Sequence, residues 1–216
     1  RLEPVRNPLD YALYILFFPH LIAGPIVRGH EFLPQLHRRK REDWPRLEMA
    51  MRLFLLGLFK KVVLADHLAP IVDPVFADPG RFASSAIWLA VFGYSVQIYC
   101  DFSGYSDMAI AIAHTFGIKL PENFRMPYFA PNITEFWRRW HMTLSRWLRD
   151  YVYIPLGGNR AGRAATYRNV IVTMAIGGLW HGAAWHFVLW GLYHGVLLSV
   201  HRMFSRRRET ASCAWR

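Results

Sequence analysis

The chain has 216 residues, enough for one domain of ordinary size, and 26 Lys and Arg face 15 Asp and Glu for a formal net charge of +11. Hydrophobic residues make up 53% and aromatic residues 16%. Two cysteines, Cys100 in an apolar run and Cys213 in a polar tail, exclude a disulfide framework and a cysteine-based zinc site. The start of the chain lacks the pattern of a signal peptide, so we expect an internal piece of a longer protein.

The basic residues stand in blocks beside apolar segments. A soluble protein with this excess of positive charge would suggest nucleic-acid binding. Blocks that flank apolar segments are instead typical of juxtamembrane residues, and they attract anionic lipid headgroups. The distribution therefore favours membrane lipids over nucleic acid as partners. The blocks are Arg38, Arg39, Lys40 and Arg41; Lys60 and Lys61; Arg138 and Arg139; and Arg206, Arg207 and Arg208.

Three stretches contain no Asp, Glu, Lys or Arg: residues 11–27, 82–100 and 169–201. A helix needs about 20 mostly apolar residues to cross the hydrocarbon core. The first stretch contains Pro19, Gly24 and Pro25, which predict a short or broken span. Residues 83–100 are predicted as one clear span, and residues 169–204 as one long or two shorter membrane segments. The fold class predicted from this pattern is an all-α polytopic membrane protein.

The remaining segments of the first half are predicted to be short helices and loops. We expect residues 28–46 to form a cytoplasmic loop with a short helix in the middle. Residues 47–65 alternate apolar and basic positions at helical spacing, which predicts an interfacial helix or a span with snorkelling lysines. Residues 66–82 contain four Pro or Gly positions and are predicted as a loop.

A polar stretch, DFSGYSD at residues 101–107, follows the clear span. We expect it to break the helix, because residues 108–118 resume the apolar character for too few positions to cross alone. Such a discontinuous or re-entrant element is tolerated only where protein or a water-filled cavity surrounds it. Asp101 and Asp107 would then either line a polar channel or cap the two helix ends.

Residues 132–158 are predicted to form an amphipathic or re-entrant helix rich in Trp and Arg. Trp137, Trp140 and Trp147 recur at helical spacing among arginines, a combination that favours the membrane interface. Those arginines suit either a phosphate-bearing donor or lipid phosphates. Residues 157–168 are predicted to form a basic, glycine-rich loop.

His181 is the first candidate for chemistry because it stands in the longest charge-free run. We expect it to be buried and neutral, and a neutral imidazole can act as general base towards a hydroxyl. A structural histidine bonded to a neighbouring helix is the alternative. His141 is the second candidate, with an interfacial role as its alternative. The spacing of His181, His186, His194 and His201 does not suit a shared metal ion, so no metal is predicted.

Four strings in this order resemble the membrane-bound O-acyltransferase family. They are FFPHLIAGPIVR (17–28), DFSGYSDMAIAIAHTFGIKLPENFRMPY (101–128), FWRRWHMTLSRWLRDYVYIPLGGNR (136–160) and GGLWHGAAWHFVLWGLYHG (177–195). They are most similar to the bacterial branch that acts in alginate O-acetylation, peptidoglycan O-acetylation and the D-alanylation of teichoic acids.

The resemblance implies tilted helices around a central funnel or tunnel, of which residues 1–216 would be one fragment. An acyl thioester would enter from the cytoplasm and a hydroxyl acceptor from the other side. The family's invariant histidine matches His181 in the WHG string, and its second motif histidine matches His141 in the RRWH string. The residues then expected to line the tunnel or contact substrate are Asp101, Ser103, Tyr105, Asp107, Arg138, Trp140 and Trp180.

The function predicted from the resemblance is acyl transfer, with acetyl as the expected group. The donor would be a thioester of coenzyme A or of an acyl carrier protein, with no bound cofactor. The acceptor would be an exported polysaccharide such as alginate, reached through a periplasmic partner acetyltransferase, and the location the bacterial cytoplasmic (inner) membrane as a multi-pass protein. Two alternatives stay open: D-alanyl or peptidoglycan acyl transfer, and a transporter or channel that uses intramembrane histidines.

Overall fold

The computed structural model describes residues 7–38 and 43–213, and the side chains of residues 206–213 are not part of the description. Several residues named above therefore lie outside it. They are Arg39, Lys40 and Arg41, and the side chains of Arg206, Arg207, Arg208 and Cys213.

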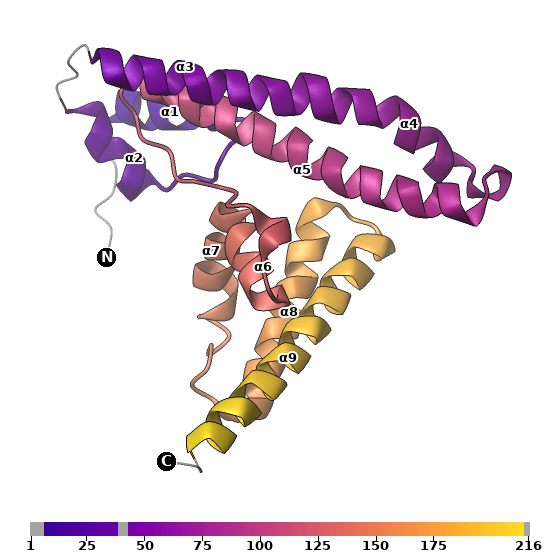
Figure 1. Ribbon diagram of the computed structural model, residues 1–216. Helices are drawn as coiled ribbons and strands as arrows, with labels where there is room; N and C mark the ends of the chain where they lie inside the picture. The colour runs from indigo at the N-terminus through magenta and orange to yellow at the C-terminus, as the bar shows by residue number, and fades with distance from the viewer. Residues whose placement is uncertain (1–6, 39–42, 214–216) are drawn as a thin grey trace. The chain divides into compact units, whose positions relative to one another are not determined.

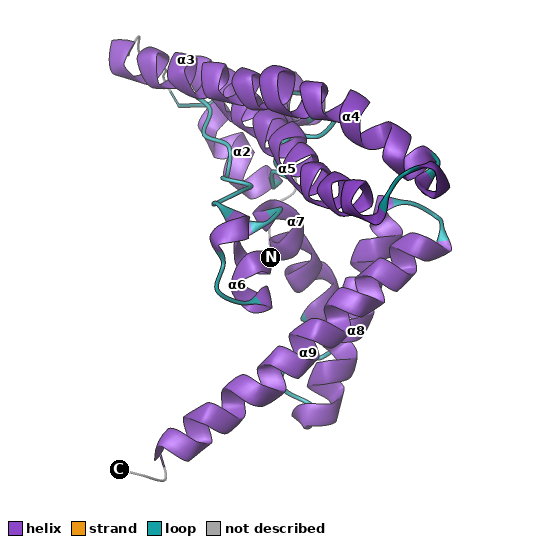
Figure 2. Cartoon of the chain, turned by 45° about the vertical axis from the view of Figure 1, so that its right-hand side comes forward, coloured by secondary structure: helices purple, strands orange, loops and turns teal. Residues whose placement is uncertain are grey.

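The described residues form helices joined by loops and contain no strand (Figure 2), which confirms the predicted all-α class. None of the helices in these ranges combines the length and the apolar character needed to cross a membrane. The chain divides into two compact units, Arg1–Asn123 and Phe124–Arg216.

The first unit opens with two short helices, α1 (Pro8–Leu16) and α2 (Gly29–Leu36), on either side of a 3-10 turn at Phe18–His20. The side chain of Asn7 begins α1 by accepting the N–H of Leu9 at 2.9 Å. Phe32 of α2 is fully buried and centres a small core. The predicted short, broken segment over residues 11–27 is confirmed, and α2 is the short helix expected within residues 28–46.

A long helical stretch follows in three parts: α3 (Trp44–Leu58), a π-helical segment (Phe59–Ala65) and α4 (Asp66–Ala77). The helix predicted for residues 47–65 is confirmed, but the loop predicted for residues 66–82 is wrong over α4. Pro70 and Pro74 lie inside this helix. Each proline removes one helical hydrogen bond, and burial of Val72 and Val75 offsets that loss. Val72 packs against Gly93 of the next helix.

Helix α5 (Ser84–Thr115) runs without interruption for 32 residues after a 3-10 turn at Pro79–Arg81. The break predicted at residues 101–107 is therefore wrong. Helix α5 lies alongside both α3 and α4, which follow one another in line (Figure 1). Gly104 serves a close approach between helices: a Cβ atom there would lie 2.7 Å from the carbonyl oxygen of Gly57. Small residues allow two helix backbones to meet in this way, and here the glycine does not mark a break.

The second unit begins with a 3-10 turn at Pro127–Phe129 and two short helices, α6 (Ile133–Arg139) and α7 (Met142–Leu148), followed by a π-helical segment (Arg149–Tyr153). Helices α8 (Gly162–His181) and α9 (Trp185–Cys213) then form an antiparallel hairpin (Figure 1). Of the two alternatives predicted for residues 169–204, one long segment or two shorter ones, the structure shows two helices. The loop predicted over residues 157–168 ends earlier, because α8 already begins at Gly162.

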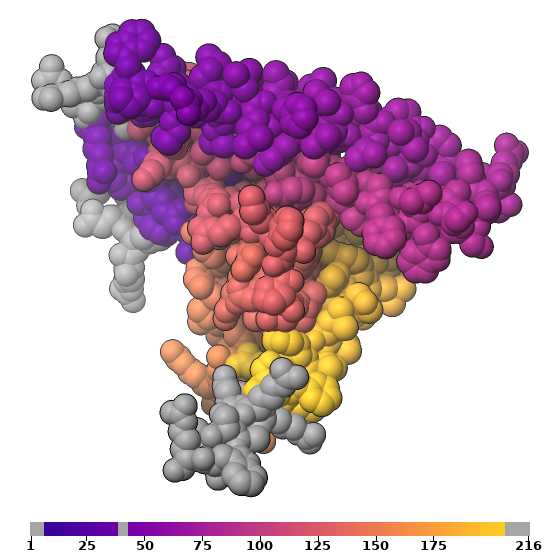
Figure 3. Space-filling view, in the orientation of Figure 1, coloured from indigo at the N-terminus to yellow at the C-terminus, as the bar shows by residue number. Residues whose placement is uncertain are grey.

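Large apolar side chains are exposed on the outer faces of both units. Figure 3 shows the surface that α3 and α4 form along one face of the first unit. Exposed apolar residues on these helices include Leu55, Ile71 and Phe76, and those on α9 include Leu189, Val196 and Phe204. Exposed apolar surface over whole helix faces is a feature of proteins that meet lipid or other protein segments.

Candidate active site

His141 lies where the chain turns between α6 and α7. Its backbone has φ 42 and ψ 55, in the left-handed region, and its carbonyl oxygen accepts the N–H of Ser145 at 3.0 Å. The single helix predicted over residues 132–158 is therefore wrong: α6 ends before Trp140, and a second helix begins after His141. Non-glycine residues enter this backbone region at a cost that the surrounding structure must offset.

Burial offsets that cost at His141. The side chain is only 3% exposed, and its ring stacks on Phe124 at a centroid distance of 6.4 Å. Because burial disfavours the charged imidazole, and because His181 adds to the effect, the pKa of His141 falls to about 3. His141 is consequently a neutral imidazole at physiological pH, able to donate or accept a hydrogen bond.

His181 is the last residue of α8, directly before the turn to α9. Its ring meets Trp190 edge-on at 5.4 Å and Phe187 at 6.2 Å. The expectation that His181 is buried is wrong, since the residue is exposed. Although His181 stands in a charge-free run of the sequence, it lies at the end of α8 next to Gly182, and the ring remains exposed there.

Trp180 connects the two histidines. Its ring lies edge-on to His141 at a centroid distance of 5.8 Å and edge-on to His181 at 5.0 Å. The structure therefore brings together three of the residues that the sequence singled out, although they come from two segments about 40 residues apart in the sequence.

A cavity of about 340 Å³ extends from His181 along one face of α8. Val170, Met174, Gly177 and His181 line it at helical spacing, a distance of about 16 Å from the first to the last at 1.5 Å per residue. Apolar side chains from other helices also line it, among them Leu144 and Leu148 of α7 and Leu198 of α9. A volume of this size is typical of small-molecule sites.

The far end of the cavity is polar and basic. Arg202 of α9 lines it and donates to the amide oxygen of Asn159 at 3.0 Å. Tyr153 hydrogen-bonds the same oxygen. Arg149 also lines the cavity and pairs with Asp150 at 2.7 Å. The cavity lining thus combines an imidazole, apolar side chains and guanidinium groups, with His181 at the hairpin turn and Arg202 beside Asn159, before the start of α8.

Two further residues from the sequence-based set belong to this unit. Arg138 lines the cavity and forms an ion pair with Glu135 at 2.6 Å. Trp140 packs against the rings of Phe124 at 5.1 Å and Phe136 at 5.7 Å, and it is absent from the cavity lining in the described part of the unit.

The four candidates at residues 101–107 belong to the first unit, on α5. Asp101 pairs with Lys61 and Asp107 with Lys60, each at 2.6 Å. Both carboxylates lie inside a continuous helix, so they do not cap helix ends, and the two lysines are held in ion pairs. Ser103 is buried and Tyr105 is half-buried. None of the four lines the cavity beside His181.

Sequence reasoning missed Asn159, Asn169 and Arg202. The Nδ2 group of Asn169, which is fully buried, donates to the carbonyl oxygens of Leu156 at 3.0 Å and Gly158 at 3.1 Å. It thereby ties the turn before α8 to the helix, and the turn presents Asn159 to Arg202. The sequence signal for this group was Asn159, at the end of the GGN string (157–159). The contact of Arg202 with Asn159 depends on the register of the α8–α9 hairpin, which the sequence does not show.

Comparison with known proteins gives a consistent set of relatives. The family whose sequence model matches is described as MBOAT, the membrane-bound O-acyltransferase family, and the match covers residues 5–215. The chain is 51% identical to a peptidoglycan O-acetyltransferase of Helicobacter pylori and 50% identical to a probable alginate O-acetylase, AlgI, of Azotobacter vinelandii. It is 32% identical to a teichoic acid D-alanyltransferase of Streptococcus thermophilus.

These matches cover most of this chain and a smaller part of each relative. They include 91% of the chain for the two acetylases and 93% for the D-alanyltransferase. The shares of the relatives' own length are 38%, 39% and 52% in the same order. The chain therefore spans less than half the length of the acetylases that it matches.

Proposed function

The chain belongs to the membrane-bound O-acyltransferase family, and on this basis we propose that the whole protein transfers an acetyl group from a thioester to a hydroxyl. The observation that carries the proposal is the cavity beside His181, whose lining combines an imidazole, apolar side chains and guanidinium groups. An acyl thioester on an anionic carrier has parts that match these three kinds of group. Its acyl end would lie at His181 and its anionic end at Arg202.

In this proposal His181 acts as general base. It takes the proton of the acceptor hydroxyl while the oxygen attacks the thioester carbonyl carbon. The resulting tetrahedral intermediate collapses, the carbon–sulfur bond breaks, and the protonated imidazole returns its proton to the leaving thiolate. Neutral His141 would donate a hydrogen bond to the oxyanion or orient the reacting groups, and Trp180, in contact with both rings, would hold the two imidazoles in place.

Acetyl is the proposed group because identity to the two acetylases, 51% and 50%, exceeds the 32% to the D-alanyltransferase. The donor would be a thioester of coenzyme A or of an acyl carrier protein. The acceptor would be an exported polysaccharide, alginate or peptidoglycan, with a periplasmic acetyltransferase as partner. The two acetylases do not separate these polymers, because their identities are almost equal.

We place the whole protein in the bacterial cytoplasmic membrane as a multi-pass protein, with helices around a funnel. Three observations support this location: membership of a membrane-bound family, the charge-free stretches flanked by basic blocks, and the exposed apolar faces of α3, α4 and α9.

The test uses the full-length protein in vesicles supplied with a labelled acetyl thioester and each candidate acceptor. His181→Ala should abolish transfer. His141→Asn should lower it strongly without disturbing the turn, because asparagine tolerates the left-handed backbone. His186→Ala is the matched control, since this exposed histidine does not line the cavity. Full activity of a folded, membrane-inserted His181→Ala protein would refute the assignment.

A further inference from the structure

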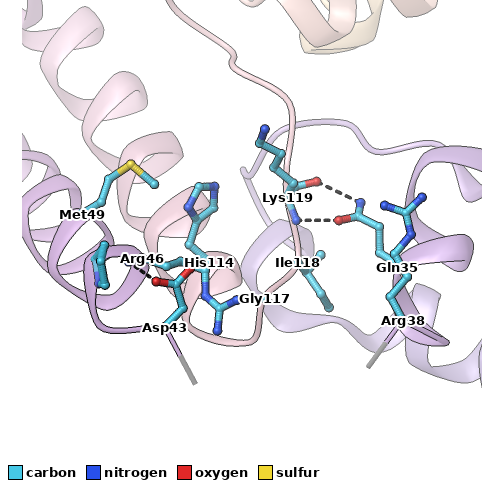
Figure 4. Close-up of a pocket in the computed structure, with 10 residues that line it drawn as sticks. Gln35, Arg38, Asp43, Arg46, Met49, His114, Gly117, Ile118 and Lys119 are labelled. Carbon is cyan, nitrogen blue, oxygen red and sulfur yellow. Dashed lines mark hydrogen bonds between the residues drawn. The ribbon is translucent and has the colours of Figure 1, made fainter. Parts of the chain in front are cut away.

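A second cavity, of about 530 Å³, lies within the first unit (Figure 4). It is formed where the end of α2, the start of α3 and the end of α5 come together. Its polar wall consists of Gln35, Arg38, Asp43, Arg46, His114 and Lys119. Among the described residues, this wall carries three guanidinium or ammonium groups and one imidazole against a single carboxylate.

The single carboxylate already has a structural role. Asp43 is the N-cap of α3, and its Oδ1 accepts the backbone N–H of Arg46 at 3.4 Å. Arg46 takes part in a further interaction of its own. The cations of the described lining that remain to contact a ligand are therefore Arg38 and Lys119. Among the residues that the structure describes, neither Arg38 nor Lys119 forms an ion pair with a carboxylate.

The position of Lys119 is fixed through its main chain. Gln35 donates from Nε2 to the carbonyl oxygen of Lys119 at 3.1 Å and accepts the Lys119 N–H on Oε1 at 2.8 Å. Gly117, with φ 67, turns the chain after α5 so that this exchange is made. Figure 4 shows the Lys119 side chain extending away from the amide of Gln35. The Lys119 main chain is therefore fixed by Gln35, and the Lys119 ammonium group takes no part in these hydrogen bonds.

We propose that this cavity binds a phosphate group. A guanidinium group such as that of Arg38 matches two phosphate oxygens at once, and an ammonium group such as that of Lys119 adds a point charge. The volume leaves room for the organic part that carries the phosphate. A phospholipid headgroup and a soluble phosphate ester present the same chemistry, and the experiment distinguishes them. The proposal does not depend on acyl transfer, because binding is measured directly.

The test uses the full-length protein, stripped of lipid in a sugar-based non-ionic detergent. One arm measures binding of pyrophosphate by equilibrium dialysis. The other measures retention of phosphatidylglycerol from mixed vesicles by native mass spectrometry. The variant is Arg38→Gln with Lys119→Gln, and Lys119→Gln alone is added because Gln35 holds its backbone whatever the side chain. Arg52→Gln is the control, an exposed arginine of α3 that is paired with Glu48.

The double variant should weaken binding of the probe about tenfold or more, since each lost charge-assisted hydrogen bond contributes roughly one factor of ten. Lys119→Gln should weaken it by a smaller factor, and Arg52→Gln should leave it within about twofold of the parent. Whichever arm shows this dependence identifies the source of the phosphate. Equal binding by the parent and both cavity variants, or no binding of either probe by the parent, would overturn the proposal.

Discussion

Gly57 of α3 and Gly104 of α5 meet backbone to backbone: a Cβ atom at Gly57 would lie 2.6 Å from the carbonyl oxygen of Gly104, and one at Gly104 would lie 2.7 Å from that of Gly57. Both distances are shorter than any non-bonded contact of a methyl group allows. Neither helix can yield by turning a side chain, because the atoms in the way are main chain. The pair therefore sets how closely the two helices pack.

We predict that Gly104→Ala destabilises the protein by about 1–3 kcal/mol, the usual cost of overpacking. The sign is informative, because alanine is favoured over glycine inside a helix by about 1 kcal/mol. The measurement is the free energy of unfolding in mixed detergent. Gly29→Ala is the control: a Cβ atom there lies 3.6 Å from Leu33, so this variant should be neutral or slightly more stable. A stabilised Gly104→Ala protein would show that the helices do not pack as described.

Breaking the ion pair between Lys60 and Asp107 should cost more stability than breaking an ordinary surface pair. Nζ and Oδ2 are 2.6 Å apart, and the two side chains are 19% and 20% exposed. Lys60→Met leaves a largely buried carboxylate without its partner, so we expect a loss of about 2 kcal/mol. The pair of Arg52 and Glu48, 78% and 64% exposed, supplies the comparison.

Arg52→Met should cost less than about 0.5 kcal/mol, because an exposed helix pair gains little in water. Both variants are compared in the same unfolding experiment. A double-mutant cycle with Asp107→Asn then isolates the interaction itself. Equal losses for Lys60→Met and Arg52→Met would show that the pair is as solvated as a surface pair.

The sequence predicted helices correctly where hydrophobic spacing or a long charge-free run defines them. It failed at Gly and Pro residues, which can either interrupt a helix or lie inside one. The spacing over residues 47–65 and the charge-free run over 169–201 gave helices that the structure confirms. Gly104 looked like a break and is a packing contact, and Pro70 and Pro74 looked like a loop and lie in α4. These outcomes depend on neighbours distant in the sequence, which a local pattern does not contain.

The candidate site shows the same division. His141, Trp180 and His181 stand in strings that sequence alone singles out, and the structure brings their rings together. The turn at His141 contains no glycine or proline, so no signal in the sequence indicated that a helix ends there. Arg202 depends on the hairpin register for its contact with Asn159, and only the folded hairpin reveals it as part of the cavity.

Asn169 and Asn132 allow one chemical change to be compared in two settings. Asn169 uses its amide N–H group to bind two carbonyl oxygens, whereas Asn132 uses its amide oxygen to accept the N–H of Glu135 at 2.9 Å. Asn169→Asp therefore loses two donors and places an anionic oxygen against two carbonyls. Asn132→Asp keeps its acceptor at the start of α6, where a negative charge is favourable.

We expect Asn169→Asp to lower the free energy of unfolding by about 2 kcal/mol, because a stronger bond from Arg168 to the new carboxylate recovers only part of the loss. Asn132→Asp should be neutral or stabilising by up to about 0.5 kcal/mol. Both are measured by denaturant unfolding, with proteolysis after Arg160 and Arg163 as a local probe of the turn. Faster cleavage should occur in Asn169→Asp alone, and similar behaviour of the two variants would contradict the assigned hydrogen bonds.

Arg202 should act on binding of the donor without acting on the chemical step. It lines the end of the cavity opposite His181, beyond the face of α8 that begins at Val170. An anionic group on the donor would be bound there, so Arg202→Gln removes an interaction made equally in the ground state and the transition state. We expect KM for the acetyl thioester to rise about tenfold and kcat to stay within about twofold.

Arg163→Gln is the matched control, because this exposed arginine lies in the first turn of α8 and does not line the cavity. It removes the same charge from the same unit and should leave KM within about twofold. Initial rates of the full-length protein over a range of thioester concentrations provide both constants. A fall in kcat with unchanged KM would place Arg202 at the reacting end, and the donor would then lie in the cavity in the reverse direction.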